Sequence, residues 1–245
     1  MPNIEVLVFV PLIVLLAYLI FGVSGFGSTL IAVPLLAHIL PLQFVIPVVV
    51  VLDCVSAISM GVKLRADVWK QEFLPMLPFL LIGLLIGAFV LLNLPTHWLF
   101  AGLGFFVVIF GSYYLIDRKS LIHLPRWAVA PIGLLAGTTS SAFGVGGPIY
   151  VFYFTARGAT PEQVRATVPA VFSFTTVARI AIFTSVGLFN KNVVITALLL
   201  LPVTLLGLWC GQRLHGSLSR DQAIRIIGGL LLLSGISLLL RAFAG

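Results

Sequence analysis

The fold is decided by a short stretch that the chain contains twice: Phe21-Gly22-Val23-Ser24-Gly25 and Phe143-Gly144-Val145-Gly146-Gly147. Each stretch interrupts an apolar run, and glycine allows the sharp change of backbone direction that ends a helix. The apolar residues that follow, 28–40 and 148–156, are too few to cross a bilayer comfortably. Residues that commonly begin helices, Ser28 with Thr29 and Pro148, stand at their starts. We therefore predict that each stretch separates a long helix from a short one.

The two stretches belong to a longer internal repeat. The shift of 122 residues that aligns them also aligns Pro47 with Pro169 and Ile58 with Ile180. After two more inserted residues, Pro78, Gly83, Gly87, Gly104 and Gly111 align with Pro202, Gly207, Gly211, Gly228 and Gly235. Ordered self-similarity at one spacing indicates a duplicated structural unit. We predict two transmembrane repeats, residues 1–121 and 122–245.

The composition predicts that lipid surrounds most of the chain. Of 245 residues, 60% are hydrophobic and 9% are charged, whereas a soluble domain carries about 25% charged residues. Apolar runs long enough to span a bilayer lie at roughly 4–21, 44–61, 74–92, 97–116, 127–142, 166–188, 193–210 and 223–240. The first run is expected to be a retained helix, because no basic segment precedes it as in a signal peptide. We predict an all-α polytopic membrane protein, a single integral membrane domain without a soluble domain.

The positions of the basic residues distinguish inverted repeats from parallel ones, because Lys and Arg prefer cytoplasmic loops. If each glycine-rich break is the tip of a hairpin, eleven Lys and Arg lie on one side of the membrane and two on the other. If each break lies within one spanning segment, the division is eight against five. We therefore predict inverted repeats, each a glycine-broken hairpin followed by three spanning helices. The predicted cytoplasmic loops are 61–73, 117–126, 157–165 and 212–225. Membrane orientation thus accounts for the net charge of +7, and no nucleic-acid partner is expected.

The two breaks are the first candidates for a binding site. A helix N-terminus presents unpaired N–H groups and the positive end of the helix dipole, which suit an anion. Glycines let the backbone approach a ligand, and hydroxyl groups add donors. In inverted repeats, the two tips are expected to face each other near the membrane midplane, the usual position of the substrate site in a secondary transporter, so a transporter of a small anion is the first functional hypothesis. The candidate substrate-binding residues are Ser24, Gly25, Phe26, Gly27, Ser28 and Thr29 in the first break and Ser140, Ser141, Gly144, Gly146 and Gly147 in the second. For the glycine pairs Gly83/Gly87 and Gly207/Gly211 we expect close helix packing instead.

Two ionisable residues, Asp53 and Arg179, lie well inside predicted spans, where each costs about 2.5–3.5 kcal/mol at a helix centre. The Arg179 guanidinium is suited to bidentate binding of an oxyanion and is the candidate cationic ligand. Asp53 is expected to pair with Arg179 or to carry a proton during transport. A structural ion pair that contacts no substrate is the alternative. The cysteines, Cys54 and Cys210, lie singly in apolar segments, and no metal or cofactor is expected.

Two other functions remain to be compared with transport. The element Gly22-Val23-Ser24-Gly25 fits the GxSG pattern of intramembrane serine proteases. Such a protease needs a buried histidine to activate the serine, but the histidines of this chain fall at span ends or in loops, at His38, His97, His123 and His215. We therefore expect no enzyme. A passive anion channel with glycine-lined tips stays open as an alternative.

The duplicated Phe-Gly-Val-x-Gly element, followed by an apolar run with Pro34, resembles the sulfite exporter TauE/SafE-like family of membrane permeases. The resemblance extends over essentially the whole chain, although the second copy continues with Pro148-Ile149-Tyr150 in place of further glycines. It implies transport, often export, of small anions such as sulfite and organosulfonates across a bacterial inner membrane. We expect a secondary transporter of this kind. Coupling to a proton or another ion, and assembly into an oligomer, are both left open.

Overall fold

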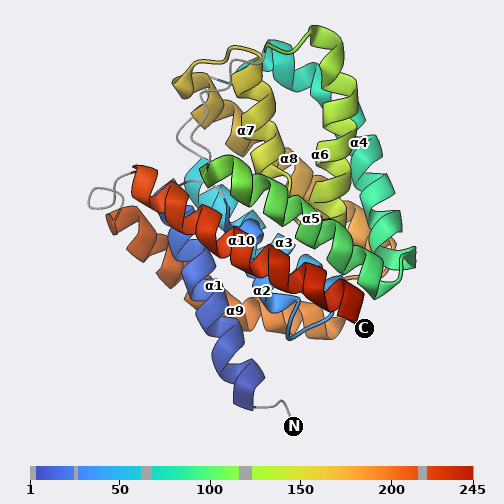
Figure 1. Cartoon of the computed structure of the whole chain (residues 1–245), viewed down its shortest axis with the longest axis vertical. Helices are drawn as coiled ribbons and strands as arrows, with labels where there is room; N and C mark the ends of the chain where they lie inside the picture. The colour runs from blue at the N-terminus through green and yellow to red at the C-terminus, as the bar shows by residue number, and fades with distance from the viewer. Residues whose placement is uncertain (1–3, 25–26, 62–67, 116–122, 215–219, 245) are drawn as a thin grey trace. The chain divides into compact units, whose positions relative to one another are not determined.

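The computed structural model describes residues 4–24, 27–61, 68–115, 123–214 and 220–244 (Figure 1). All regular structure in these ranges is helical, so the predicted all-α class is confirmed. The helices are α1 (Ile4–Ser24), α2 (Ser28–Leu36), α3 (Leu42–Gly61), α4 (Lys70–Asn93), α5 (Thr96–Leu115), the 3-10 turn η1 (Arg126–Ala128), α6 (Val129–Phe143), α7 (Gly147–Ala156), α8 (Pro161–Ser185), α9 (Lys191–Leu214) and α10 (Arg220–Ala244).

Each predicted apolar run overlaps a helix, although the run at 127–142 begins in η1 and the run at 166–188 continues three residues beyond α8. The run at 74–92 lies within α4, for example, and the run at 193–210 lies within α9. The glycine-rich stretches separate a long helix from a short one as predicted, since α2 has nine residues and α7 has ten. By length and composition, α4, α8 and α9 are long and apolar enough to cross a membrane. The chain is therefore organised as an integral membrane protein.

The helices form two compact units. Unit 1 comprises Met1–Leu52, Leu94–Arg118 and Asn190–Gly245, and unit 2 comprises Asp53–Asn93 and Lys119–Phe189. Unit 1 thus contains α1, α2, α5, α9, α10 and the first half of α3. Unit 2 contains the second half of α3 with α4, α6, α7 and α8. Each unit takes helices from both halves of the chain.

In unit 1, glycines bring two pairs of helices close together. The pairs are α1 with α9, and α5 with α10, and the latter two lie side by side in Figure 1. A Cβ atom on Gly207 of α9 would lie 2.7 Å from the carbonyl oxygen of Leu15 on α1, and one on Gly211 would collide with the carbonyl oxygen of Leu19. Because side chains at Gly207 and Gly211 would collide with the facing backbone, the predicted packing role of these glycines is confirmed.

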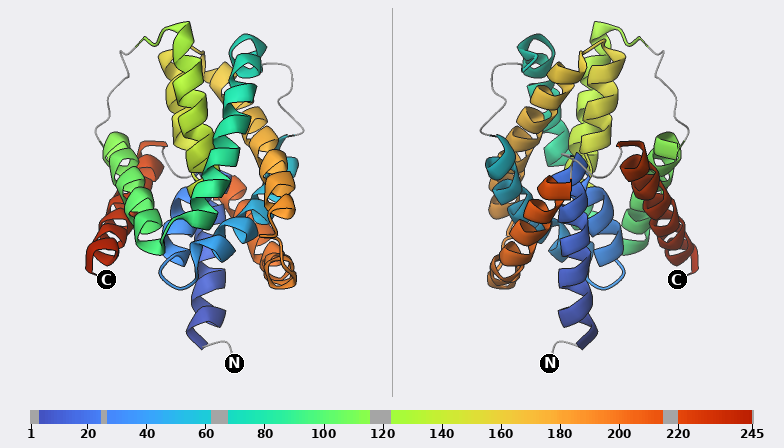
Figure 2. Two further views of the ribbon diagram at one scale, coloured as in Figure 1. Left: turned by 90° about the vertical axis from the view of Figure 1, so that its right-hand side faces the viewer. Right: turned by 90° about the vertical axis from the view of Figure 1, so that its left-hand side faces the viewer.

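In unit 2, the corresponding close contact joins α4 and α6, which lie against each other in Figure 2. Cβ atoms on Gly83 and Gly87 of α4 would collide with the carbonyl oxygens of Leu134 and Thr138 on α6. Gly137 of α6 meets the α4 backbone in the same way. The packing role predicted for Gly83 and Gly87 is therefore also confirmed.

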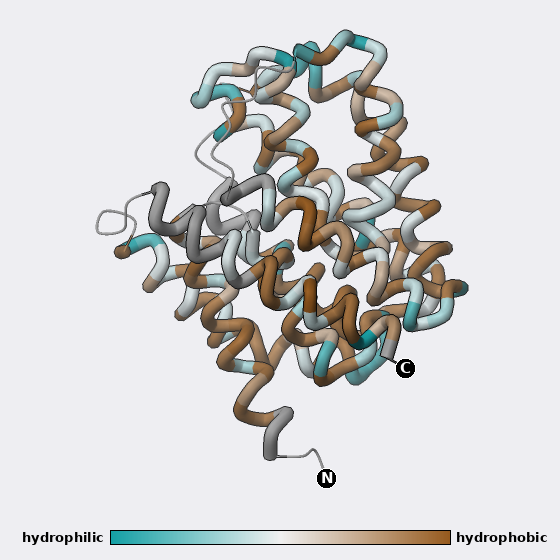
Figure 3. The backbone as a smooth tube through the Cα atoms, viewed as in Figure 1, coloured by the Kyte–Doolittle hydropathy of each residue, from teal (hydrophilic) through white to brown (hydrophobic). Residues whose placement is uncertain are grey.

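Many large hydrophobic side chains are exposed on the helix surfaces, which is unfavourable in water. Hydrophobic residues run along most helices, and hydrophilic residues gather at helix ends and connections (Figure 3). Large side chains such as Phe89 on α4, Phe105 on α5 and Leu199 on α9 are 67%, 64% and 72% exposed. Exposed apolar surface on this scale marks a contact with lipid or with another protein. Trp98 and Trp127, near the starts of α5 and α6, are exposed as interfacial anchors should be.

Candidate functional site

The first break lies in unit 1. Helix α1 ends at Ser24, whose side chain lies outside the described residues, as do Gly25 and Phe26 entirely. Gly27 precedes α2 with a φ of 97°, a left-handed conformation that favours glycine. Ser28 and Thr29 form the start of α2, as predicted, and are buried.

The second break lies in unit 2 and is described in full. Helix α6 ends at Phe143 and is followed by Gly144, whose φ of 75° turns the chain. The N–H of Val145 then donates to the carbonyl oxygen of Thr139 at 3.2 Å, which satisfies one carbonyl of the last helical turn. Gly146 caps the start of α7, and Pro148 stands in its first turn, as predicted.

The two glycines at the start of α7 have different surroundings. A Cβ atom on Gly147 would meet nothing within 4 Å, so there is open space beside this buried residue. A Cβ atom on Gly146 would lie 2.5 Å from the hydroxyl oxygen of Tyr150, whose ring folds back over the start of its own helix. At the start of α7, the Tyr150 hydroxyl therefore lies beside Gly146, and open space lies beside Gly147.

Arg179 of α8 reaches this second break. Its side chain is fully buried, and its Nη1 donates a hydrogen bond of 2.9 Å to the carbonyl oxygen of Ser140, in the last turn of α6. Its Nη2 lies 4.0 Å from Oδ2 of Asp53, which is also fully buried. The structure therefore brings Arg179, Asp53 and the second break together inside unit 2. The first break belongs to unit 1, and its predicted approach to the second stays a prediction.

Tyr150 also lies beside the second break, and the sequence did not single it out. Its side chain is fully buried, interacts electrostatically with Arg179 and lies near the side chains of Ser140 and Thr175. A tyrosine in an apolar helix is more commonly a packing residue, so its type alone does not single it out. Its position could have singled it out: Tyr150 follows Gly146 by four residues, and residues at that separation lie on the same face of a helix.

Three buried hydroxyl groups of unit 2 have no hydrogen-bond partner within the described part of the chain. They belong to Ser141 of α6, Tyr150 of α7 and Thr176 of α8, and all are at most 1% exposed. Thr176 precedes Arg179 by three residues and so lies on the same face of α8. Buried polar groups nearly always have partners, so the unpartnered hydroxyls of Ser141 and Tyr150 on the two helices of this break suggest a ligand.

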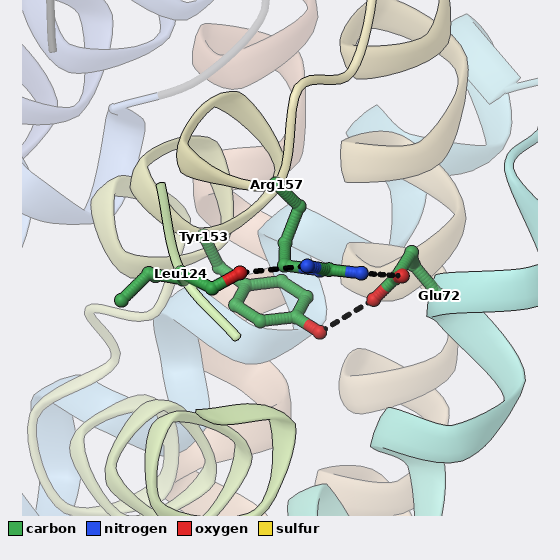
Figure 4. Close-up of polar contacts among 4 residues, drawn as sticks. All are labelled: Glu72, Leu124, Tyr153 and Arg157. Carbon is green, nitrogen blue, oxygen red and sulfur yellow. Dashed lines mark hydrogen bonds and ion pairs between the residues drawn. The ribbon is translucent and has the colours of Figure 1, made fainter. Parts of the chain in front are cut away.

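A second polar cluster, also missed from sequence, lies where α7 ends (Figure 4). The hydroxyl of Tyr153 donates to Oε2 of Glu72 at 2.6 Å, and Nη2 of Arg157 pairs with Oε1 of the same carboxylate at 2.6 Å. Arg157 also donates through Nη1 to the carbonyl oxygen of Leu124 at 2.6 Å. We call Glu72, Tyr153 and Arg157 the α7 anchor, because they tie the end of α7 to the start of α4. The hydrogen bond that Arg157 donates to the Glu72 carboxylate holds the pKa of Arg157 above its ordinary value, so the guanidinium stays charged.

Comparison with known proteins identifies the family. The family model described as sulfite exporter TauE/SafE matches residues 10–238. The chain belongs to the sulfite exporter TauE/SafE family. Members of this family are transporters of small anions in a lipid bilayer, so the protease interpretation of the GxSG element is set aside.

Two relatives illustrate the family. The "Probable inner membrane transporter protein TsaS" of Comamonas testosteroni is 26% identical over 193 residues, which are 78% of this chain and 80% of TsaS. The "Probable sulfite/organosulfonate exporter TauE" of Cupriavidus necator is 29% identical over 112 residues, which are 46% of this chain and 44% of that TauE. No solved structure matches the chain.

Proposed function

We propose that this chain is a secondary transporter that exports a small oxyanion, sulfite or an organosulfonate, across a bacterial inner membrane. Family membership supports a small anion as the transported substrate. The name of the Cupriavidus necator relative supports sulfite or an organosulfonate as that anion. The observation that carries the proposal is the buried guanidinium of Arg179 beside the second break. A cation buried at membrane depth is costly, and such residues commonly mark the path of a substrate.

The anion binds, in this proposal, between the start of α7 and Arg179. In the first turn of α7 the N–H groups of Ile149 and Tyr150 already bond to the carbonyl oxygen of Gly146, and Pro148 has no N–H. The N–H of Gly147 therefore supplies the first-turn donor at the positive end of the helix, next to the open space beside that residue. Ser140, Ser141, Gly144 and Gly146 build the rest of the break, and the first break is proposed to contribute further donors.

Asp53 is proposed to couple transport to a proton. Arg179 and Asp53 together carry no net charge, so an anion that reaches Arg179 brings a second negative charge next to the carboxylate. Repulsion between like charges is strong where water is excluded. A proton taken up by Asp53 removes this repulsion, which links anion binding to proton binding.

We further propose that residues 1–121 and 122–245 are inverted repeats, with loops 61–73, 117–126, 157–165 and 212–225 in the cytoplasm. The packing inside each unit supports the repeat. Gly83 of α4 lies against α6 near Gly137, and Gly207 of α9 lies against α1 near Leu15. The repeat alignment relates Gly83 to Gly207 and Leu15 to Gly137. The same pair of equivalent helices thus makes the same glycine contact once in each unit.

Flux measurements in reconstituted vesicles test the proposal. Sulfite, sulfate, sulfoacetate and simple carboxylates are offered with and without a pH gradient. We expect saturable uptake and countertransport of sulfite or sulfoacetate, loss of both in Arg179→Ala, and impairment in Arg179→Lys, which cannot bind in a bidentate manner. Arg165→Ala, which removes an exposed arginine from the same helix, is the matched control and keeps activity. Flux proportional to voltage without countertransport would identify a channel, and wild-type flux in Arg179→Ala would refute the site.

A further inference from the structure

The hydroxyl group of Tyr150 occupies an unusual position. It is fully buried, and it lies directly over the first residues of α7, because a Cβ atom on Gly146 would be 2.5 Å away from it. Ser140 and Thr175 lie nearby, yet among the described residues none forms a hydrogen bond of ordinary geometry with this hydroxyl. Burying a hydroxyl without a partner costs free energy, so a phenylalanine would be cheaper if only packing mattered.

Two of the groups near this hydroxyl act only as donors. Arg179, which interacts electrostatically with Tyr150, offers a guanidinium that can only donate. The start of α7 offers the backbone N–H of Gly147 and the positive end of the helix dipole. Such surroundings favour a ligand rich in acceptor oxygens.

We propose that the Tyr150 hydroxyl donates a hydrogen bond to the transported anion and selects sulfonate-type anions over carboxylates. Three separate donors then surround the anion: the start of α7, the Arg179 guanidinium and the Tyr150 hydroxyl. A sulfonate or sulfite presents three oxygens in a pyramid, one toward each donor, whereas the two oxygens of a carboxylate lie in one plane and cannot meet donors from three directions with good geometry. A buried donor left unpaired disfavours the wrong ligand, which is the physical basis of this selectivity. The inference rests on the proposed function of the same site.

Gly146 is part of this selectivity because it leaves room for the tyrosine. A methyl group there would meet the hydroxyl oxygen at 2.5 Å and the ring carbon that bears it at 2.8 Å, so the ring has to move. Gly146→Ala is therefore expected to displace the donor without removing it. It gives a second test that does not depend on the loss of the hydroxyl itself.

Methanesulfonate and acetate, which differ in the anionic group, are the probes. Their affinities are measured on purified full-length protein from the ligand-induced rise in thermal unfolding temperature. Tyr150→Phe is expected to weaken methanesulfonate binding about 10- to 100-fold, which corresponds to the loss of one hydrogen bond to a charged group. Acetate binding by this variant should stay nearly unchanged. Without ligand, its unfolding temperature stays the same or rises, because an unpartnered hydroxyl has been removed. Gly146→Ala shows the same preferential loss of methanesulfonate.

Tyr153→Phe is the matched control. It removes a hydroxyl from an equally buried tyrosine three residues later on α7, but this hydroxyl donates to Glu72 and not to the break. It should lower the unfolding temperature and keep the ratio of the two affinities. If wild-type protein binds neither anion, the proposed function fails. If wild-type protein binds methanesulfonate and Tyr150→Phe binds it equally well, or loses both anions equally, the inference on Tyr150 is overturned while the proposed function stands.

Discussion

The α7 anchor should contribute measurably to the stability of this transporter, and one substitution isolates part of it. Tyr153→Phe removes the hydrogen bond of 2.6 Å from the tyrosine hydroxyl to the Glu72 carboxylate and keeps the ring. Glu72 is 6% exposed and Tyr153 is fully buried, so solvent does little to screen or replace this contact. A hydrogen bond to a charged group contributes about 1.5–3 kcal/mol. At about 2–4 °C per kcal/mol for a protein of this size, the midpoint of unfolding should fall by about 3–12 °C.

The measurement is thermal unfolding in detergent, followed in wild-type protein, Tyr153→Phe, Glu72→Ala and the double variant. Glu72→Ala should be the more harmful single change, about 3–5 kcal/mol, because it leaves the charge of Arg157 without its partner at the end of α7. In the double variant, Tyr153→Phe should add little, since the acceptor of its hydrogen bond has already gone. If Tyr153→Phe has no effect, or if the two effects simply add, the anchor does not stabilise α7 in the way described.

Three further expectations follow from the packing, the buried charges and the topology. Gly87→Ala should lower the unfolding temperature, because the new methyl group collides with an α6 carbonyl oxygen. Gly229→Ala on α10 is the control and should be tolerated, since its methyl group meets nothing within 4 Å. Similar unfolding temperatures for the two variants would refute the packing role. Asp53→Asn should keep anion exchange but make flux independent of an imposed pH gradient, and gradient-driven flux in this variant would exclude Asp53 as the proton carrier. Single cysteines introduced at positions 123 and 190 of a cysteine-free variant should be labelled from the cytoplasmic and the outer side respectively, and labelling of both from one side would contradict the inverted topology.

The helices and their breaks were predictable because they depend on nearby residues. Apolar run length sets the ends of α4 and α9 to within a few residues, and Pro148 marks the start of α7 because it lacks an N–H and fits the first turn. The packing role of Gly83 and Gly87 was also accessible, since their spacing of four residues keeps both on one face of a helix.

Apart from the approach of Asp53 to Arg179, which was expected because both are ionisable residues inside predicted spans, the polar contacts were much harder to predict. They join residues that are distant in sequence. Arg179 bonds to the carbonyl of Ser140, 39 residues away, and Arg157 pairs with Glu72, 85 residues away. Nothing in the local pattern of a sequence specifies such pairs. Tyr150 was missed for a different reason: its hydroxyl faces the start of α7 only because Gly146 has no side chain to exclude it.

Direct titration of sulfite into purified protein tests the central claim, that Arg179 and the second break bind the transported anion. Wild-type protein and Arg165→Ala should show saturable binding with similar affinity. Arg179→Ala, checked for folding by its thermal unfolding, should show none, because it removes the buried cation next to the start of α7. Equal sulfite affinity in the wild-type protein and a folded Arg179→Ala variant would contradict the account.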